Sequence, residues 1–365
     1  MPPTKKPKAK LSKQKLGVEA LVKELSSKYK KKALITLGRD FRFAEIERVP
    51  TGSFGLDWAI SGGWPRGRIS QLKGPESASK TTLSLHAAAL ACVNKQRVLW
   101  ASAEEFDWSW AVKCGVPEGS TNFGLALAEE GNHLLDLVID ATFSGQWDLI
   151  VIDSIAALRN WEYLIDGRSG KINKGVGEMT RGGEAKMINE FVARFFSACH
   201  GVTRRREDGE DVRLPALIAI NQIRTQGLGS GYAKNDSGGG WGLKHGKSVD
   251  VFLRRAENIV LGEKDDPMVV ARRVHFEITK NKTGVPYRHG TYCLGLLDHG
   301  GYTKGRIDRA GEVAQLAKRM GIIQQAGAWF AIEDTKFQGE AQLVAAIRDD
   351  DVLRQAREQK IVSLQ

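Results

Sequence analysis

The sequence predicts an α/β protein built around a mostly parallel sheet. Strand-forming segments of five or six residues alternate with longer helix-forming segments between Ile69 and Thr279, which is the pattern of strands joined by covering helices. One connection, at residues 74–81, joins a predicted strand directly to a predicted helix. After Gly300 the glycine-rich spacing gives way to helical periodicity, so residues 300–365 are predicted to form a small C-terminal α/β domain.

The core elements follow one another along the chain. Strand 69–73 leads through the loop to helix 81–95, and strand 97–102 precedes helix 134–143. The remaining predicted elements are strands 148–153, 216–221, 249–253 and 274–279 and helices 184–199, 312–320 and 342–348.

The sequence before the core predicts a disordered tail followed by a helix and a strand. Lysine and proline dominate residues 1–15, which we expect to be disordered. An amphipathic helix follows, because apolar residues recur at steps of three and four: Val18, Leu21, Val22, Leu25 and Tyr29. Residues 33–37 are apolar and predict a strand. A helix and strand this far ahead of the core can pack on their own body or on a neighbouring molecule.

Composition excludes several classes of protein. The 365 residues are 42% hydrophobic and 27% charged, as in ordinary soluble proteins. There is no run of about 18 apolar residues that would span a membrane, and the N-terminus lacks the apolar segment of a secretory signal. The four cysteines have no metal-ligand spacing. Reduced thiols and a cytoplasmic location are the simplest interpretation.

The charge distribution indicates a polyanionic partner. Residues 1–32 contain eleven lysines and only two acidic residues, so most of the net charge of +11 lies there. A basic arm on a nearly neutral body is typical of nucleic-acid binding. A solvated lysine tail that aids solubility is the alternative, and charge alone does not decide between them.

The loop at residues 74–81 predicts a phosphate-binding site. Its sequence, Gly-Pro-Glu-Ser-Ala-Ser-Lys-Thr, lies between a strand and a helix, where backbone N–H groups and a helix N-terminus face phosphates. Lys80 would reach the β- and γ-phosphates, and the Thr81 hydroxyl would hold Mg²⁺. The motif has glycine before the lysine, whereas this chain has Ser79, whose Cβ would lie where the backbone approaches phosphate.

Two carboxylates are predicted at the same edge of the sheet. Asp153 ends the apolar strand 148–153, as a magnesium-holding aspartate does, although an aspartate there also commonly caps the next helix. Glu104 follows strand 97–102 and could orient or deprotonate an attacking water. Glu105 is expected to point to the other face, because side chains alternate along a strand.

At this point the chain resembles the RecA family. The segments that carry the resemblance occur in the family's order and cover about residues 16–340: 51–57, 67–69, 74–77, 221–224, 280–282 and 326–329. The resemblance implies a RecA-like P-loop ATPase core at 46–299, an N-terminal helix-strand polymerisation arm at 16–45 and the C-terminal domain at 300–365. Head-to-tail contacts through such an arm would build a helical filament.

The resemblance also implies roles for single residues. Glu104 would be the catalytic glutamate, acting with Lys80, and Gln222 would sense the γ-phosphate. Lys280 and Lys282, which otherwise look like a basic turn, would reach the nucleotide of the adjacent subunit in trans. The implied ATP site comprises Gly74, Pro75, Glu76, Ser77, Ala78, Ser79, Lys80, Thr81, Thr82, Asp107, Trp110, Asp153 and Gln222, with Thr81 and Asp153 on Mg²⁺. Asp107 and Trp110 would contact the adenine, on which an indole can stack.

Two segments match the family's DNA loops. Residues 223–242 contain seven glycines and are expected to be mobile until a ligand orders them, and a flexible connector is the alternative interpretation. Gly239 and Gly240 would let N–H groups approach phosphates. The basic residues assigned to DNA are Arg159, Arg168, Lys171, Lys174 and Arg181 in the first loop and Arg224 and Lys244 beside the second. The first loop, residues 159–181, is expected to be longer than in typical members of the family, and a second insertion carries Arg204, Arg205 and Arg206. The set of basic residues that touches DNA therefore stays open.

The expected activity is DNA-dependent ATP hydrolysis with homologous pairing and strand exchange between single-stranded DNA and homologous double-stranded DNA. One alternative is a filament-forming protein that binds ATP and DNA but hydrolyses little, because Ser79 impairs the loop. A second is a RecA-fold helicase or related ring ATPase, which the N-terminal arm disfavours.

Overall fold

A computed structural model describes most of the chain. The residues described are 17–29, 46–128, 130–158, 183–223, 240–262 and 266–364. The chain divides into two units, residues 1–45 and 46–365. In the first unit, α1 (Val18–Tyr29) is the helix predicted from apolar spacing. The predicted tail 1–15 and strand 33–37 lie outside the described residues.

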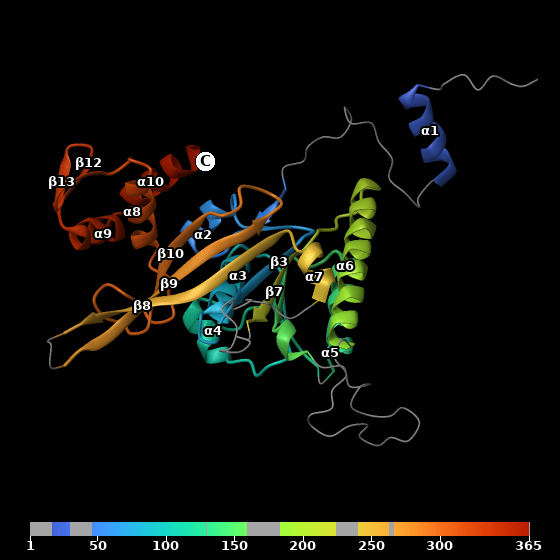
Figure 1. The fold of residues 1–365 in the computed structure, drawn as a ribbon, viewed down its shortest axis with the longest axis horizontal. Helices are drawn as coiled ribbons and strands as arrows, with labels where there is room; N and C mark the ends of the chain where they lie inside the picture. Colours follow the sequence, from blue (N-terminus) through green and yellow to red (C-terminus); the bar gives the residue numbers. More distant parts are fainter. Residues whose placement is uncertain are drawn as a thin grey trace, which may run out of the picture. The chain divides into compact units, whose positions relative to one another are not determined.

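The second unit contains an eight-stranded, mostly parallel sheet, which confirms the predicted α/β class. The strand order is β10-β9-β8-β3-β7-β6-β4-β5, and the five pairings from β8 to β5 are parallel (Figure 1). The pairings of β9 with β8 and of β10 with β9 are antiparallel. The strands are β3 (Ile69–Gly74), β4 (Val98–Ser102), β5 (Phe123–Leu127), β6 (Leu149–Asp153), β7 (Ala216–Gln222), β8 (Val249–Leu261), β9 (Met268–Asn281) and β10 (His289–Gly295).

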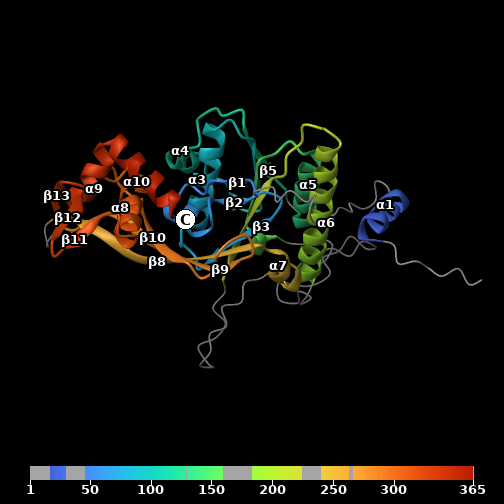
Figure 2. The same ribbon diagram turned by 90° about the horizontal axis from the view of Figure 1, so that it is seen from above.

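Helices cover both faces of this sheet. They are α2 (Phe54–Ala59), α3 (Lys80–Val93), α4 (Trp108–Cys114), α5 (Gly131–Ser144), α6 (Gly183–Glu207) and α7 (Gly240–Gly246). Alternate residues of one strand enter different cores: Leu149 and Val151 pack with α2, α3 and α4, while Ile150 and Ile152 pack with α5, α6 and α7. Both views show α5 and α6 side by side on their face (Figure 2).

The antiparallel edge is longer than the apolar pattern predicts. The predicted strands 249–253 and 274–279 lie within β8 and β9, which continue as a hairpin beyond the residues of β8 that pair with β3. From Arg254 the side chains of β8 are largely exposed, so the apolar signal ends there although the strand does not. Hydrogen bonding to β9 maintains the extension.

The C-terminal residues form a small domain with its own core. It consists of α8 (Arg309–Arg319), β11 (Gln324–Ala326), β12 (Trp329–Ile332), β13 (Thr335–Gln338), α9 (Glu340–Asp349) and α10 (Asp351–Ser363). Its three strands form a separate antiparallel sheet. Val313, Phe330, Leu343 and Ile361 meet in the core, together with Phe54 from the N-terminus of α2. The domain therefore packs on the end of the unit that carries α2 and β10.

The other elements are short. A two-stranded sheet pairs β1 (Arg48–Val49) with β2 (Trp64–Pro65), and the one-turn helix η2 (Ile155–Ala157) follows β6. In the described part of the chain, no helix combines the length and apolarity needed to cross a bilayer.

Candidate nucleotide site and its surroundings

The register of the parallel strands brings the predicted site residues together. Ser102 at the end of β4 lies opposite Asp153 at the end of β6, and Gly74 at the end of β3 lies opposite Gln222 at the end of β7. Because the carboxyl ends of parallel strands meet at one edge of the sheet, segments separated by up to 148 residues converge there.

The loop between β3 and α3 has a strained geometry at two serines. Ser77 and Ser79 both have positive φ angles, of 58° and 64°. The left-handed region favours glycine, and position 79 is where the phosphate-loop motif has glycine. Ser79 precedes α3 as its N-cap but makes no capping hydrogen bond with its side chain. Glycine is required at position 74 for a different reason, because a Cβ there would lie 2.3 Å from the carbonyl oxygen of Leu253.

Lys80 points its ammonium group back into the loop. The Nζ atom donates hydrogen bonds to the carbonyl oxygens of Gly74 (3.1 Å) and Pro75 (2.7 Å). Burial lowers the pKa of Lys80, whereas the carboxylates of Asp153, Glu104 and Glu76 act in the opposite direction. A buried lysine that spans its own loop is a cation held in place for an anionic ligand.

Thr81 and Asp153 form the candidate magnesium pair. The Thr81 hydroxyl donates a hydrogen bond of 3.0 Å to Oδ2 of Asp153. Burial raises the pKa of Asp153 to about 6, with a smaller contribution from Glu104, although the bond from Thr81 and the charge of Lys80 oppose the rise. A hydroxyl and a carboxylate are oxygen ligands that fit Mg²⁺. Asp153 does not cap the next helix, since the N-cap of η2 is Ser154.

Glu104 lies beyond the end of β4 and is exposed. Its Oε1 accepts a hydrogen bond of 2.7 Å from the Ser154 hydroxyl, next to Asp153. The Ser102 hydroxyl bridges the carbonyl oxygens of Glu104 and Asp153, which ties the two strand ends together. Because β4 ends at Ser102, as predicted, the alternation of side chains along the strand does not extend to Glu104 and Glu105, and it gives no basis for the expected direction of Glu105.

Asp107 and Trp110 lie at the start of α4. Asp107 caps the helix, because its Oδ1 accepts hydrogen bonds from the Trp110 N–H (3.0 Å) and the Ser109 hydroxyl (2.8 Å). The Trp110 indole N–H lies 3.3 Å from the Thr82 hydroxyl oxygen, so the ring sits beside the first turn of α3. Trp110 therefore lies beside the helix that follows the loop, whereas the contacts of Asp107 are those of an N-cap of α4.

Gln222 is exposed at the end of β7, beside the start of the loop. It pairs in register with Gly74, and the next residue, Ile223, donates its N–H to the Gly74 carbonyl oxygen at 3.3 Å. The segment that follows is the predicted second DNA loop. Gln222 thus connects the nucleotide edge to that loop through the backbone.

Lys280 and Lys282 contact α7 in this subunit. Lys280 Nζ donates to the carbonyl oxygen of Lys244 (2.8 Å), and Lys282 Nζ donates to that of His245 (2.9 Å). Burial and the charges of Lys282 and Lys247 lower the pKa of Lys280. The sequence did not indicate that these lysines hold the helix at the end of the second DNA loop.

Two of the residues predicted for DNA binding are described. Gly240 begins α7 with a φ of 64°, and Lys244 is exposed, with its Nζ 4.8 Å from the centre of the Trp241 ring. Arg159, Arg168, Lys171, Lys174, Arg181, Arg224 and Gly239 lie outside the described residues. Sequence reasoning missed Trp241, although an aromatic residue directly after three glycines was a usable signal.

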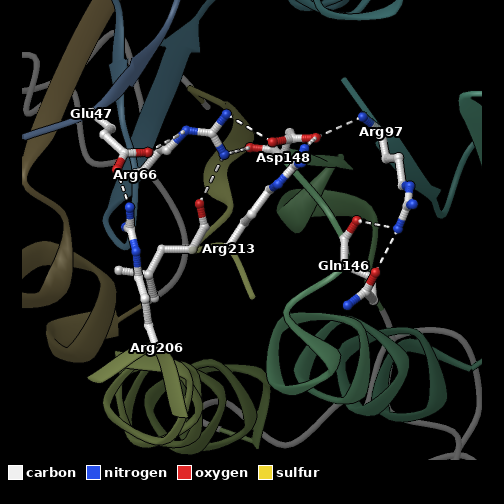
Figure 3. A network of polar contacts seen from close by, with 8 residues as sticks. Glu47, Arg66, Arg97, Gln146, Asp148, Arg206 and Arg213 are labelled. Atoms are coloured by element: carbon white, nitrogen blue, oxygen red, sulfur yellow. Dashed lines mark hydrogen bonds and ion pairs between the residues drawn. The ribbon is translucent and has the colours of Figure 1, made fainter. Parts of the chain in front are cut away.

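The arginines of the second insertion occupy the opposite edge of the sheet. Arg206 pairs with Glu47 (2.7 Å), and Arg66 joins Glu47 to the buried Asp148 (Figure 3). Asp148 also accepts from the Arg97 N–H (2.9 Å) and contacts Arg213. Residues 66, 97, 148 and 213 all precede parallel strands, so this network stabilises the amino edge, away from the nucleotide edge.

Fold and site together define an α/β protein of the nucleotide-binding P-loop class. A loop between strand and helix carries a buried lysine, β6 ends in an aspartate, and a glutamate lies just beyond the end of β4. The comparisons with known proteins narrow this class.

The chain belongs to the RecA family. The family model for the RecA N-terminal domain matches residues 16–300. Protein RecA of Chlorobaculum parvum is 31% identical over 364 residues, which cover 99% of this chain and 94% of that protein. Protein RecA of Nitratidesulfovibrio vulgaris is 32% identical over 362 residues (97% and 92%), and that of Helicobacter pylori is 29% identical over 341 (92% and 89%). Membership makes the chain an ATP- and DNA-binding protein of recombination and repair.

Proposed function

We propose that the chain is an ATP-dependent recombinase that forms helical filaments on single-stranded DNA, pairs it with homologous duplex and hydrolyses ATP in a DNA-dependent reaction. The observation that carries the proposal is the convergence of Lys80, Asp153, Glu104 and Gln222 on one sheet edge in a RecA family member.

Each residue of the nucleotide site has a role that follows from its side-chain chemistry. Lys80 exchanges its two carbonyl partners for phosphate oxygens, and Thr81 and Asp153 hold Mg²⁺, which would neutralise charge on the triphosphate. Glu104, exposed and steadied by Ser154, orients and deprotonates the attacking water. Asp107 and Trp110 contact the adenine of ATP, and the indole ring of Trp110 stacks on it.

Nucleotide binding would be coupled to DNA binding by loops that begin at this same edge of the sheet. Gln222 contacts the γ-phosphate and transmits its presence to the second DNA loop, which follows it in the chain. Residues of that loop and of its end bind the DNA strand: Arg224, Gly239, Gly240 and Lys244. The first loop would contribute Arg159, Arg168, Lys171, Lys174 and Arg181. Binding through phosphates is sequence-independent and weakens with salt.

Assembly completes the site. The arm at residues 16–45 would dock on a neighbouring subunit, and Lys280 and Lys282 of one subunit would reach the nucleotide of the next. Hydrolysis would then require the filament. The core would span 46–299 and the C-terminal domain 300–365, with a disordered tail at 1–15.

Electron microscopy with a strand-exchange assay tests the proposal. With Mg²⁺ and a slowly hydrolysed ATP analogue, the full chain should form helical filaments on single-stranded DNA, and with ATP it should exchange strands with homologous duplex. A Lys80→Ala variant should do neither. Hexameric rings, or monomers that ignore the oligonucleotide, would contradict the proposal.

A further inference from the structure

We propose that Trp241, on the first turn of α7, is a stacking platform for an unpaired nucleobase. The proposal rests on the proposed function, because it names one contact that the DNA site makes. No sequence motif assigned Trp241 a role.

The exposure of the indole is the first observation. Trp241 is 69% exposed, whereas Trp64 and Trp100 are fully buried, and no other tryptophan in the described ranges is as open to solvent. Single exposed apolar side chains are common on protein surfaces, so exposure alone assigns no role. It leaves the ring of Trp241 open to a ligand, and the neighbouring side chains indicate which ligand.

The ring is held in a defined position among cations. The His245 imidazole, one helical turn away, stacks on it with centroids 5.5 Å apart and an interplanar angle of 12°. Lys244 places its ammonium group 4.8 Å from the ring centre. Both neighbours are exposed. An aromatic plane beside basic side chains is how proteins bind single strands, with bases on the ring and phosphates on the cations.

Helix α7 is anchored firmly enough to act as a platform. The Gly242 N–H donates to Oδ1 of Asn189 on α6 at 2.6 Å, and a Cβ at Gly242 would lie 2.4 Å from that oxygen. Leu243 is buried in the core. In the single subunit, Lys280 and Lys282 also bind carbonyl oxygens at the end of the helix, whereas the contacts of Gly242 and Leu243 do not depend on these lysines. A base that stacks there loses little free energy to ordering of the protein.

The charge around the helix favours a polyanion as the occupant. Lys244, Lys280 and Lys282 lie at its C-terminal end. The carboxylate of Asp250, on β8, is already paired with Lys73 (2.8 Å) and Lys247 (2.7 Å). Duplex bases are stacked on one another, so only an unpaired base offers a free face. Single-stranded DNA is therefore the partner we assign to Trp241.

Binding to oligonucleotides with and without bases tests the platform. Fluorescence anisotropy would measure the full chain, with Mg²⁺ and a slowly hydrolysed ATP analogue, on labelled oligo(dT) and on an abasic oligomer of equal length. Trp241→Ala should bind oligo(dT) roughly tenfold or more weakly, and Trp241→Phe much less so. On the abasic oligomer, Trp241→Ala should match the parent protein. Its salt dependence should be unchanged, because no phosphate contact is lost.

The matched control is Trp329→Ala, which removes a 48% exposed tryptophan from β12 in the C-terminal domain. It should bind oligo(dT) like the parent. Equal binding of oligo(dT) by the parent and Trp241→Ala would overturn the platform while leaving the proposed function intact. Equal losses on both oligomers, or a change in self-association alone, would also overturn it. Failure of the parent to bind oligo(dT) would instead reject the proposed function.

Discussion

The ammonium group of Lys280 donates a hydrogen bond of 2.8 Å to the backbone carbonyl oxygen of Lys244, at the end of α7. Carbonyl groups in the last turn of a helix have no partner within the helix and favour cations. The lysine proposed to serve a neighbour's nucleotide is therefore bound, in the single subunit, to the helix beside the second DNA loop. It must leave α7 to act in trans, which links the two sites.

Replacing Lys280 by alanine should impair neighbouring subunits. In filaments mixed one to one with Glu104→Gln, which lacks the catalytic carboxylate of its own site, Lys280→Ala should restore about a quarter of the parent rate, because a Lys280→Ala subunit next to a Glu104→Gln subunit has both groups at its site. Each variant alone should hydrolyse little ATP in the same steady-state assay. Lys336→Ala, which changes an exposed lysine on β13, is the control and should match the parent. No recovery in the mixture would show that Lys280 serves its own subunit or none.

Replacing Ser79 by glycine should improve the nucleotide loop. Ser79 has a φ of 64°, which costs a residue with a Cβ about 1 kcal/mol. Ser79→Gly removes this strain and the Cβ beside the phosphates, so ATP should bind several-fold more tightly. Ser79→Ala, which keeps the Cβ and loses only the hydroxyl, should bring no gain. Titration with a fluorescent ATP analogue compares them. Equal gains for both variants would mean that the hydroxyl, and not the backbone, is the obstacle.

Glu312 should make stability depend on pH. It is buried between α8 and α2, where it accepts hydrogen bonds from the Ser53 hydroxyl and from the N–H groups of Phe54 (3.1 Å) and Gly55 (3.2 Å). Burial raises its pKa from 4.5 to about 8 despite these bonds. The folded state therefore holds a proton that the unfolded state releases, so this contribution is complete below pH 4.5 and is lost as pH rises to about 8.

Glu312→Gln cannot titrate, and its unfolding midpoint in urea should fall less than that of the parent between pH 5 and pH 8. Asp57, whose pKa burial raises to about 6, remains in both proteins, so the difference between the two curves isolates Glu312. Parallel curves would rule out a proton on this carboxyl in the folded protein.

The network in Figure 3 should stabilise the amino edge through Asp148. The Asp148 side chain is 1% exposed and pairs with Arg66 at 2.9 Å, itself 9% exposed. Asp148→Ala leaves the arginine and the Arg97 N–H without this acceptor and should lower the free energy of unfolding by about 3 kcal/mol. Glu47→Gln, at a side chain 53% exposed, should cost less than about 1 kcal/mol. Similar losses from both changes in chemical denaturation would disprove the distinction.

Sequence patterns predicted the parts of the fold that are local. The buried strands β6 and β7 contain the uninterrupted apolar runs 149–152 and 216–220. Asp153 ends β6, the loop follows β3, and Glu104 lies just beyond β4, so parallel topology was enough to place them at one edge. The elements missed lack such runs. In β5, Gly124 interrupts the run of large apolar residues but not the strand, and a Cβ there would lie 3.0 Å from the Trp147 ring. The three-stranded C-terminal sheet has strands of only three or four residues.

Contacts between segments that lie far apart in the chain could not be predicted from sequence patterns. The bonds from Lys280 and Lys282 to α7 span 35 to 37 residues, and neither segment carries a motif for the other. Glycine content drew attention to the loop at 223–242 as a flexible segment and away from Trp241, whose exposure is a property of the folded surface. Asp107 was assigned to the adenine, whereas its cap on α4 depends on where that helix begins.

The most direct test of the account is ATP hydrolysis measured with and without single-stranded DNA. The parent protein should hydrolyse ATP at least tenfold faster with DNA. Asp153→Asn, which keeps a side chain that can bond Thr81 but loses the charge, should reduce the stimulated rate about 100-fold or more at an unchanged unfolding midpoint. Asp334→Asn, on the exposed turn between β12 and β13, should leave it unchanged. A rate that DNA does not alter, or that survives in Asp153→Asn, would contradict the assignment of this sheet edge as a DNA-controlled ATPase site.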